Sequence, residues 1–252
     1  MPRFCANLTF LFTEVPLMER FVYAKEAGFE AVEILDPYNA PVQDMRDQLV
    51  WQGLKMALIS CPPPNYTGGA PGYAAVPESR FRQDFKRTLR YAEALGAEFV
   101  QILAGEAEGP EARATFVDNL RWASGYARRQ KLTIEPLNPV DHPGHFLNDY
   151  YQARDVLEEV SAPNLHLQFD TYQVARIHGD VMSVWGDLRD FVAHVQIAQA
   201  LDQSEPIGPG VDFPAFFDRL DADGYDGWVS AEYHPAGTTV QGLGWFAAAY
   251  QR

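Results

Sequence analysis

The sequence predicts a single-domain (β/α)₈ barrel, an α/β fold that spans residues 1–252. Strand-like and helix-like segments alternate along the whole chain, and no Gly/Ser-rich linker divides it. The joints from helix to strand repeat a pattern in which a glycine follows the helical segment, as at Gly28, Gly96 and Gly224. Glycine can adopt the left-handed conformation that ends a helix. Repeated βα units in a chain of this length are typical of the barrel.

Eight segments with β-branched and apolar residues are predicted strands: 3–8, 31–35, 55–59, 99–103, 132–135, 165–170, 192–197 and 228–232. Amphipathic segments are predicted helices: 16–27, 41–52, 79–95, 111–130, 149–160, 180–189, 214–222 and 239–250. A doubly wound open sheet is the alternative, but no GxGxxG motif follows the first strand. The pattern therefore favours the closed barrel.

The composition predicts a globular protein of the cytoplasm. Hydrophobic residues make up 47% of the chain, and its formal net charge is −14. Such a charge disfavours nucleic acid and anionic membranes as partners. The apolar cluster at 8–12 is too short for a signal peptide or a membrane span. The two cysteines, Cys5 and Cys61, form no CxxC pair.

Four polar residues stand at the ends of predicted strands: Glu135, Asp170, Gln196 and Glu232. In a barrel these ends meet at the carboxyl mouth, where barrel enzymes place their chemistry. Three carboxylates and one amide oxygen suit one hard divalent cation, Mg²⁺ or Mn²⁺, and a cation would relieve their repulsion. The Gly- and Pro-rich connection 61–78 is expected to cover this mouth as a lid.

Several motifs resemble the hydroxypyruvate isomerase family of the xylose isomerase-like barrels. They are Thr-Glu-Val-Pro at 13–16, Ile-Glu-Pro-Leu-Asn-Pro at 134–139, His-Val-Gln-Ile-Ala at 194–198, Glu-Pro at 205–206, Gly-Tyr-Asp-Gly-Trp at 224–228 and Gly-Leu-Gly-Trp-Phe at 242–246. The resemblance covers essentially the whole chain. It implies an isomerase in which Glu135, Asp170, Gln196 and Glu232 bind the metal, and Glu135 and Glu232 also act as acid and base.

Such an isomerase would move a carbonyl between adjacent carbons of a small hydroxy-carbonyl substrate. Removing the proton beside the carbonyl creates an enediolate, whose charge a divalent cation stabilises. No lysine stands at a predicted strand end, since Lys55 and Lys131 lie at the start of their strands or directly before it, which argues against a Schiff-base aldolase. His194 is inward-facing, and a hydrogen-bonded barrel residue is the favoured interpretation of it. The oligomeric state stays open, with a homo-oligomer among the alternatives.

The expected substrate pocket departs from the family pattern. Gln173 stands where the family has histidine, Gln203 stands where it has arginine, and Pro209-Gly210 replaces Gly-Glu. The candidate substrate-binding residues are Gln173, Gln203, Glu205, His145 and Arg176, the last of which is expected on a turn after Asp170. Because two neutral amides replace two potentially cationic groups, a neutral sugar is favoured over an acid.

Two other functions remain open, and a third is disfavoured. A ketose 3-epimerase would use the same metal site and the same two glutamates. An apurinic-site endonuclease normally needs a histidine-rich zinc cluster, which this sequence does not suggest. A metal-binding barrel that has lost its activity is the third alternative, because Gln173 and Gln203 alter the expected pocket.

Overall fold

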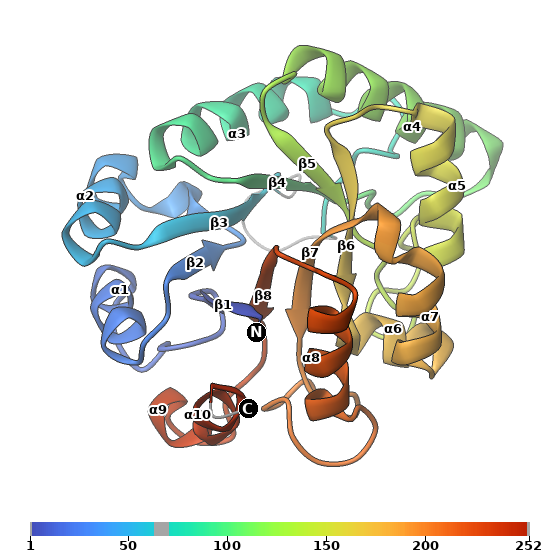
Figure 1. The fold of residues 1–252 in the computed structure, drawn as a ribbon. Helices are drawn as coiled ribbons and strands as arrows, with labels where there is room; N and C mark the ends of the chain where they lie inside the picture. The colour runs from blue at the N-terminus through green and yellow to red at the C-terminus, as the bar shows by residue number, and fades with distance from the viewer. Residues whose placement is uncertain (1, 63–70, 251–252) are drawn as a thin grey trace.

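Eight parallel strands form a closed barrel in the computed structural model, which describes residues 2–62 and 71–250. Each strand pairs with the next one along the chain, and β8 pairs with β1 through the register Arg3↔Trp228. The helices surround these strands (Figure 1). The predicted (β/α)₈ fold class is therefore confirmed.

The strands are short and regularly spaced. They are β1 (Arg3–Asn7), β2 (Ala31–Ile34), β3 (Lys55–Ser60), β4 (Phe99–Ile102), β5 (Lys131–Ile134), β6 (Leu165–Asp170), β7 (Val192–Ile197) and β8 (Trp228–Ala231). The α-helices are α1 (Leu17–Glu26), α2 (Val42–Gln52), α3 (Phe81–Leu95), α4 (Gly109–Tyr126), α5 (Tyr150–Val160), α6 (Thr171–His178), α7 (Val181–Leu188), α8 (Phe213–Ala222), α9 (Thr239–Gly242) and α10 (Gly244–Ala249). Two 3₁₀ turns, η1 (Pro37–Asn39) and η2 (Arg189–Phe191), complete the described elements.

Two predicted elements differ in the structure. The segment after Asp170 was expected to be a turn, but it forms α6, because the Asp170 side chain caps the helix by accepting from the Tyr172 amide at 2.9 Å. The helix predicted over 239–250 is divided at Leu243 into α9 and α10. Gly242 lies against Glu205 at this break, where an added Cβ would be 2.4 Å from Glu205 Oε1.

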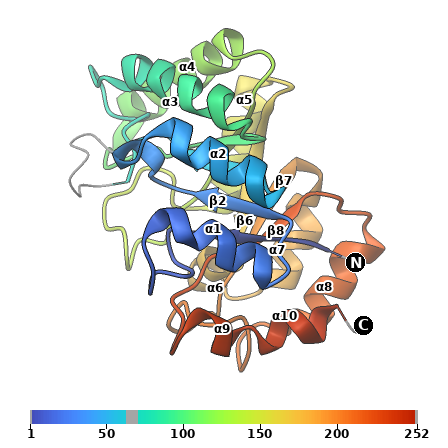
Figure 2. The same ribbon diagram turned by 90° about the vertical axis from the view of Figure 1, so that its left-hand side faces the viewer.

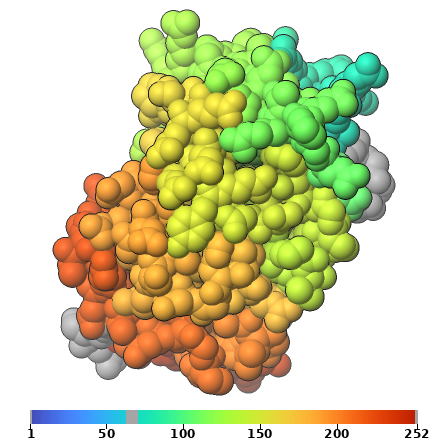
Figure 3. Space-filling model, turned by 90° about the vertical axis from the view of Figure 1, so that its right-hand side faces the viewer, coloured from blue at the N-terminus to red at the C-terminus, as the bar shows by residue number. Residues whose placement is uncertain are grey.

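Most of the apolar core lies between the barrel and its helices. α3 shows the pattern that builds it, because Phe81, Phe85, Leu89 and Ala92 recur on one buried face. Gly96, with φ 64°, ends this helix in the left-handed conformation. In the side view, α1 and α2 lie outside β2 (Figure 2). The outer face in Figure 3 is formed mainly by the green-to-orange second half of the chain.

A second, smaller apolar cluster fills one end of the barrel interior. It consists of Cys5, Ala31, Ala57 and Trp228. Side chains alternate along a strand, so Trp228, Ser230 and then Glu232 follow one another on the inner side of β8 and its extension. The apolar layer thus lies at the strand starts and the polar layers lie toward the strand ends. No described helix is both long and apolar enough to cross a lipid bilayer.

Candidate active site

A cavity of about 600 Å³ opens at the carboxyl ends of the strands. Both predicted acid–base residues, Glu135 and Glu232, line it, and they come from strand ends three positions apart around the barrel. Asp170 and Gln196 are completely buried and do not line this cavity. Two of the four predicted ligands therefore face the cavity, and two lie in the barrel interior.

Local backbone structure places each of these side chains. Glu135 directly follows β5, and Pro136 cannot donate a further ladder hydrogen bond. Glu232 directly follows β8, where its backbone amide donates to the Ile197 carbonyl at 3.2 Å. Asp170 ends β6, where its backbone amide donates to the Tyr150 hydroxyl at 3.1 Å. The strand ends therefore hold the three carboxylates at similar heights in the barrel.

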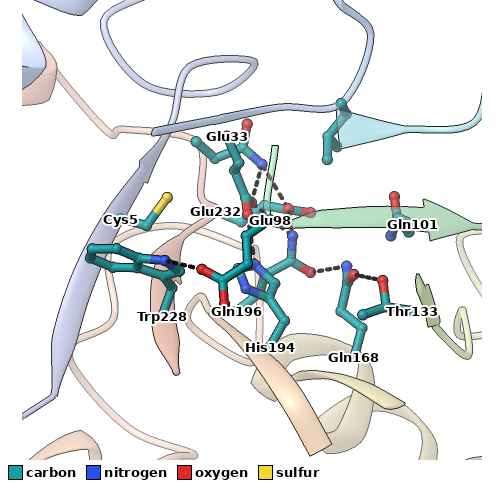
Figure 4. Close-up of polar contacts among 12 residues, drawn as sticks. Cys5, Glu33, Glu98, Gln101, Thr133, Gln168, His194, Gln196, Trp228 and Glu232 are labelled. Carbon is teal, nitrogen blue, oxygen red and sulfur yellow. Dashed lines mark hydrogen bonds and ion pairs between the residues drawn. The ribbon is translucent and has the colours of Figure 1, made fainter. Parts of the chain in front are cut away.

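Amide side chains link the two glutamates across the barrel. Gln168 Nε2 donates to Glu135 Oε2 at 3.0 Å and to Gln196 Oε1 at 2.6 Å. Gln196 Nε2 donates in turn to Glu232 Oε2. Thr133 Oγ1 donates to Gln168 Oε1 at 2.9 Å on the other side of that amide (Figure 4). A continuous chain of hydrogen bonds thus joins Glu135 to Glu232.

Glu33 on β2 joins these hydrogen bonds through Gln196. Its Oε1 accepts from Asn7 Nδ2 and from Gln196 Nε2, each at 2.8 Å. Its Oε2 lies 2.7 Å from His194 Nε2, and both side chains are completely buried. The interpretation of His194 as a hydrogen-bonded barrel residue is therefore confirmed. Because a carboxylate only accepts, Glu33 holds the amide nitrogen of Gln196 on its own side.

The buried carboxyl groups of Glu135, Glu232, Asp170 and Glu33 alter one another's pKa values. Burial, followed by the charges of Asp170 and Glu33, raises the pKa of Glu135 well above its ordinary value. Burial and the charges of Glu33, Glu135 and Asp170 do the same to the pKa of Glu232. Burial, together with the charge of Glu33, raises the pKa of Asp170 to about 7. This cluster therefore favours neutralisation by protons or by a cation.

Glu33 is the exception within this cluster. Burial acts to raise its pKa, but the charge of His194 and hydrogen bonds from His194 and Gln196 outweigh burial and lower the pKa. Glu33 therefore favours its ionised form more than the other carboxyl groups of this cluster do. Sequence reasoning missed this residue, although a glutamate at the inward position of an apolar strand could have revealed it.

The donor set fits a hard divalent cation in its chemistry. Asp170 Oδ2 is buried without a hydrogen-bond partner, while Oδ1 caps α6. Carboxylate and amide oxygens are the ligands that Mg²⁺ and Mn²⁺ prefer. Among the described residues, however, no three acidic, histidine or cysteine side chains already converge on one point. Hydrogen bonds from amides instead occupy oxygens of Glu135 and Glu232.

The predicted substrate-binding residues divide into two groups. Gln173 and Gln203 line the cavity. Glu205 is buried and does not line the cavity, and its carboxylate accepts from the Ala236 amide at 3.0 Å. His145 lines a different pocket, with Glu106 and Asp149, and Arg176 is exposed on α6.

The predicted lid lies partly outside the described residues, because the structure does not describe 63–70. Of the described part, Cys61, Pro71 and Gly72 line the cavity. Gly72 pairs with Ala104 in an isolated bridge. The described ends of this connection therefore border the cavity.

Other residues of the cavity wall were not predicted from sequence. Gln101 on β4 donates to Glu135 Oε2 and accepts from Ser60 Oγ. Asp36, Asp141 and His234 also line the cavity. Gln101 shares the signal that could have revealed Glu33, a polar residue inside an apolar strand. Asp36, Asp141 and His234 lie beyond strand ends, where the hydrophobic pattern is uninformative.

Comparison with known proteins agrees with this architecture. Residues 21–249 match the family described as Xylose isomerase-like TIM barrel. A 2-oxo-tetronate isomerase of Cupriavidus necator is 38% identical over 97% of this chain and 97% of its own length. The hydroxypyruvate isomerase of Escherichia coli is 33% identical over 97% and 98%. A solved structure described as an AP endonuclease, family 2, from Brucella melitensis has a TM-score of 0.94 at 36% identity, covering 98% of this chain and 99% of its own.

The closed barrel and the relatives named as isomerases define this protein as a barrel isomerase. The chain belongs to the xylose isomerase-like TIM barrel family. The resemblance inferred from the motifs is therefore confirmed.

Proposed function

We propose that the protein is a divalent-metal-dependent isomerase that moves a carbonyl between adjacent carbons of a small hydroxy-carbonyl compound. The observation that carries this proposal is the pair Glu135 and Glu232, two linked carboxylates on the wall of one cavity. The names of the relatives, 2-oxo-tetronate isomerase and hydroxypyruvate isomerase, support the reaction type.

The residues that would hold the ion are Glu135, Asp170, Gln196 and Glu232. The unpartnered Oδ2 of Asp170 and the raised carboxyl pKa values support this assignment. When bound, a divalent ion supplies positive charge to the substrate oxygens as the proton leaves. Glu33 would keep the Gln196 amide nitrogen turned toward itself, and the amide oxygen, which accepts from Gln168, would offer its second lone pair to a cation.

Proton transfer would fall to the two glutamates. One takes the proton from the hydroxyl-bearing carbon beside the carbonyl, and the same or the other glutamate returns a proton to the former carbonyl carbon. The hydroxyl that becomes the new carbonyl gives up its proton, and the former carbonyl oxygen gains one. Gln101 and Gln168, which donate to Glu135, would hold the first carboxylate. Asn7, which donates to Glu232 Oε2 at 2.7 Å, would hold the second.

Product analysis tests the reaction type. The protein is incubated with Mg²⁺ or Mn²⁺ and with hydroxypyruvate, a 2-oxo-tetronate and neutral ketoses and aldoses, and the products are identified by NMR. We expect the carbonyl to appear on the adjacent carbon. A product that keeps the carbonyl in place and inverts a neighbouring carbon would instead identify a ketose 3-epimerase.

The AP endonuclease description of the Brucella structure raises a second possibility, which the cavity does not favour. Five carboxylate side chains line it, which would repel a phosphate backbone. They are Asp36, Glu135, Asp141, Asp202 and Glu232. An assay on DNA with abasic sites would detect such an activity, and we expect none.

A further inference from the structure

The charge of the cavity wall points to the kind of substrate. Besides Glu135 and Glu232, three carboxylates line the cavity: Asp36, Asp141 and Asp202. None of the described residues that line it is a lysine or arginine. The sequence of 63–70, outside the described residues, also contains no lysine or arginine. Apart from the imidazoles of His142 and His234, the wall therefore offers a substrate carboxylate negative charges and no guanidinium or ammonium group.

Asp36 is the acid whose hydrogen bonds are least complete. It follows β2 by two residues, and its Oδ1 is buried without any hydrogen-bond partner. Its Oδ2 accepts only a long hydrogen bond, 3.4 Å, from Asn39 Nδ2. A buried acceptor without a donor is unfavourable. The weak Asn39 contact leaves Oδ2 with acceptor capacity, so a hydroxyl group in the cavity can donate to this oxygen.

Asp141 and Gln173 are fixed by contacts within the protein. Asp141 Oδ2 accepts from the Tyr172 hydroxyl at 2.6 Å and from Asn138 Nδ2 at 2.9 Å. Gln173 Oε1 accepts from the backbone and side-chain amides of Asn138, each at 2.8 Å. The oxygen of Gln173 is therefore used, and its amide nitrogen remains to donate to a ligand oxygen.

We propose that the cavity selects a hydroxyl-rich carbonyl compound without a carboxylate, with Asp36 as a specificity-determining residue that accepts hydrogen bonds from its hydroxyl groups. This inference rests on the isomerase function proposed for the same cavity. Carboxylates accept well from sugar hydroxyls, whereas a second carboxylate beside Asp36 would be repelled. The acids in the names of the relatives are thus poorer substrates for this chain.

Steady-state kinetics test the substrate class. We expect the best neutral ketose or aldose, among trioses to hexoses, to have a kcat/KM at least about tenfold above those of hydroxypyruvate and a 2-oxo-tetronate. If an acid is isomerised more efficiently than every neutral sugar, the inference is overturned while the proposed function stands. If no compound of either class is isomerised, both are overturned.

Variants of Asp36 test the residue. Asp36→Ala should raise KM for the best neutral sugar about tenfold with kcat little changed, because a hydroxyl loses its acceptor. Asp36→Asn retains an oxygen acceptor, so KM should recover most of this loss, and the removed charge should raise kcat/KM for hydroxypyruvate. Asp44→Asn removes the same charge from the exposed face of α2 and should match the parent. A parental KM in both Asp36 variants would overturn the role of this residue.

Discussion

Beneath the cavity, side-chain amide nitrogens donate hydrogen bonds to the buried glutamate carboxylates. Asn7, Gln196 and Gln168 each donate to at least one glutamate, and Glu33 accepts from two of them. A flipped amide would place oxygen against oxygen, so each orientation depends on its neighbour. The sequence could identify the polar residues at strand ends, but it could not predict this order, which depends on contacts across the closed barrel.

Asp170 has two separate tasks that substitution can distinguish. Asp170→Asn keeps an oxygen for the Tyr172 amide and so preserves the cap of α6, but it removes the charge. Asp170→Ala removes both the cap and the charge, and should lower the free energy of unfolding by about 1 kcal/mol more than Asp170→Asn does. By calorimetry with Mn²⁺, we expect no measurable binding in Asp170→Ala and at least about tenfold weaker binding in Asp170→Asn. Parental affinity in both variants would rule out Asp170 as a ligand.

His145 should make the protein sensitive to acid. It is 1% exposed with both ring nitrogens unpartnered, and burial, followed by the charge of His142, lowers its pKa to about 3. The unfolded chain binds a proton near pH ~6.5, so His145 destabilises the fold progressively as pH falls from there toward about 3. Between about pH 6.5 and about pH 4.5, the parent should lose about 2 kcal/mol more than His145→Phe.

Urea unfolding of the two proteins at both pH values measures this difference. His142 and His166, whose pKa values are also lowered by burial, are present in both proteins and cancel in the comparison. Equal losses of stability in parent and variant would show that His145 becomes protonated without opposition from the fold.

At the scale of elements, turns and short helices were the least predictable. α6 begins directly where β6 ends, so no loop residues separate the two patterns in the sequence. Arg176, expected on a turn, consequently lies on an exposed helix face. The strands were predicted within one residue at most ends, because their apolar runs are bounded by polar residues.

Gly72 fixes the loop at the edge of the cavity to the end of β4. Its φ is 78°, and an added Cβ would lie 2.3 Å from the Leu103 carbonyl oxygen. Gly53 has a similar φ of 63° but nothing within 4 Å of an added Cβ. Gly53→Ala should therefore cost about 1 kcal/mol from backbone conformation alone, whereas Gly72→Ala should cost more because backbone atoms must move. Urea unfolding measures the free energy of unfolding of both variants, and equal losses would contradict the close approach at Gly72.

At the scale of the whole molecule, barrel closure makes the site. Glu135 and Glu232 lie far apart in the sequence, yet hydrogen bonds through Gln168 and Gln196 connect them. The sequence predicted this convergence because equivalent strand ends meet at one mouth of a barrel. It did not predict that His145 and Glu205 would point elsewhere, since loop conformation determines their placement.

The exchange of carbon-bound hydrogen in D₂O tests the central claim most directly. With a substrate of the parent enzyme and Mn²⁺, Glu135→Gln and Glu232→Gln keep an oxygen at each position but remove the base. Each variant should exchange at least ~10²-fold more slowly than the parent, while Glu93→Gln, an exposed change on α3, should exchange at the parental rate. Parental exchange rates in both site variants would contradict the assignment of proton transfer to these two glutamates.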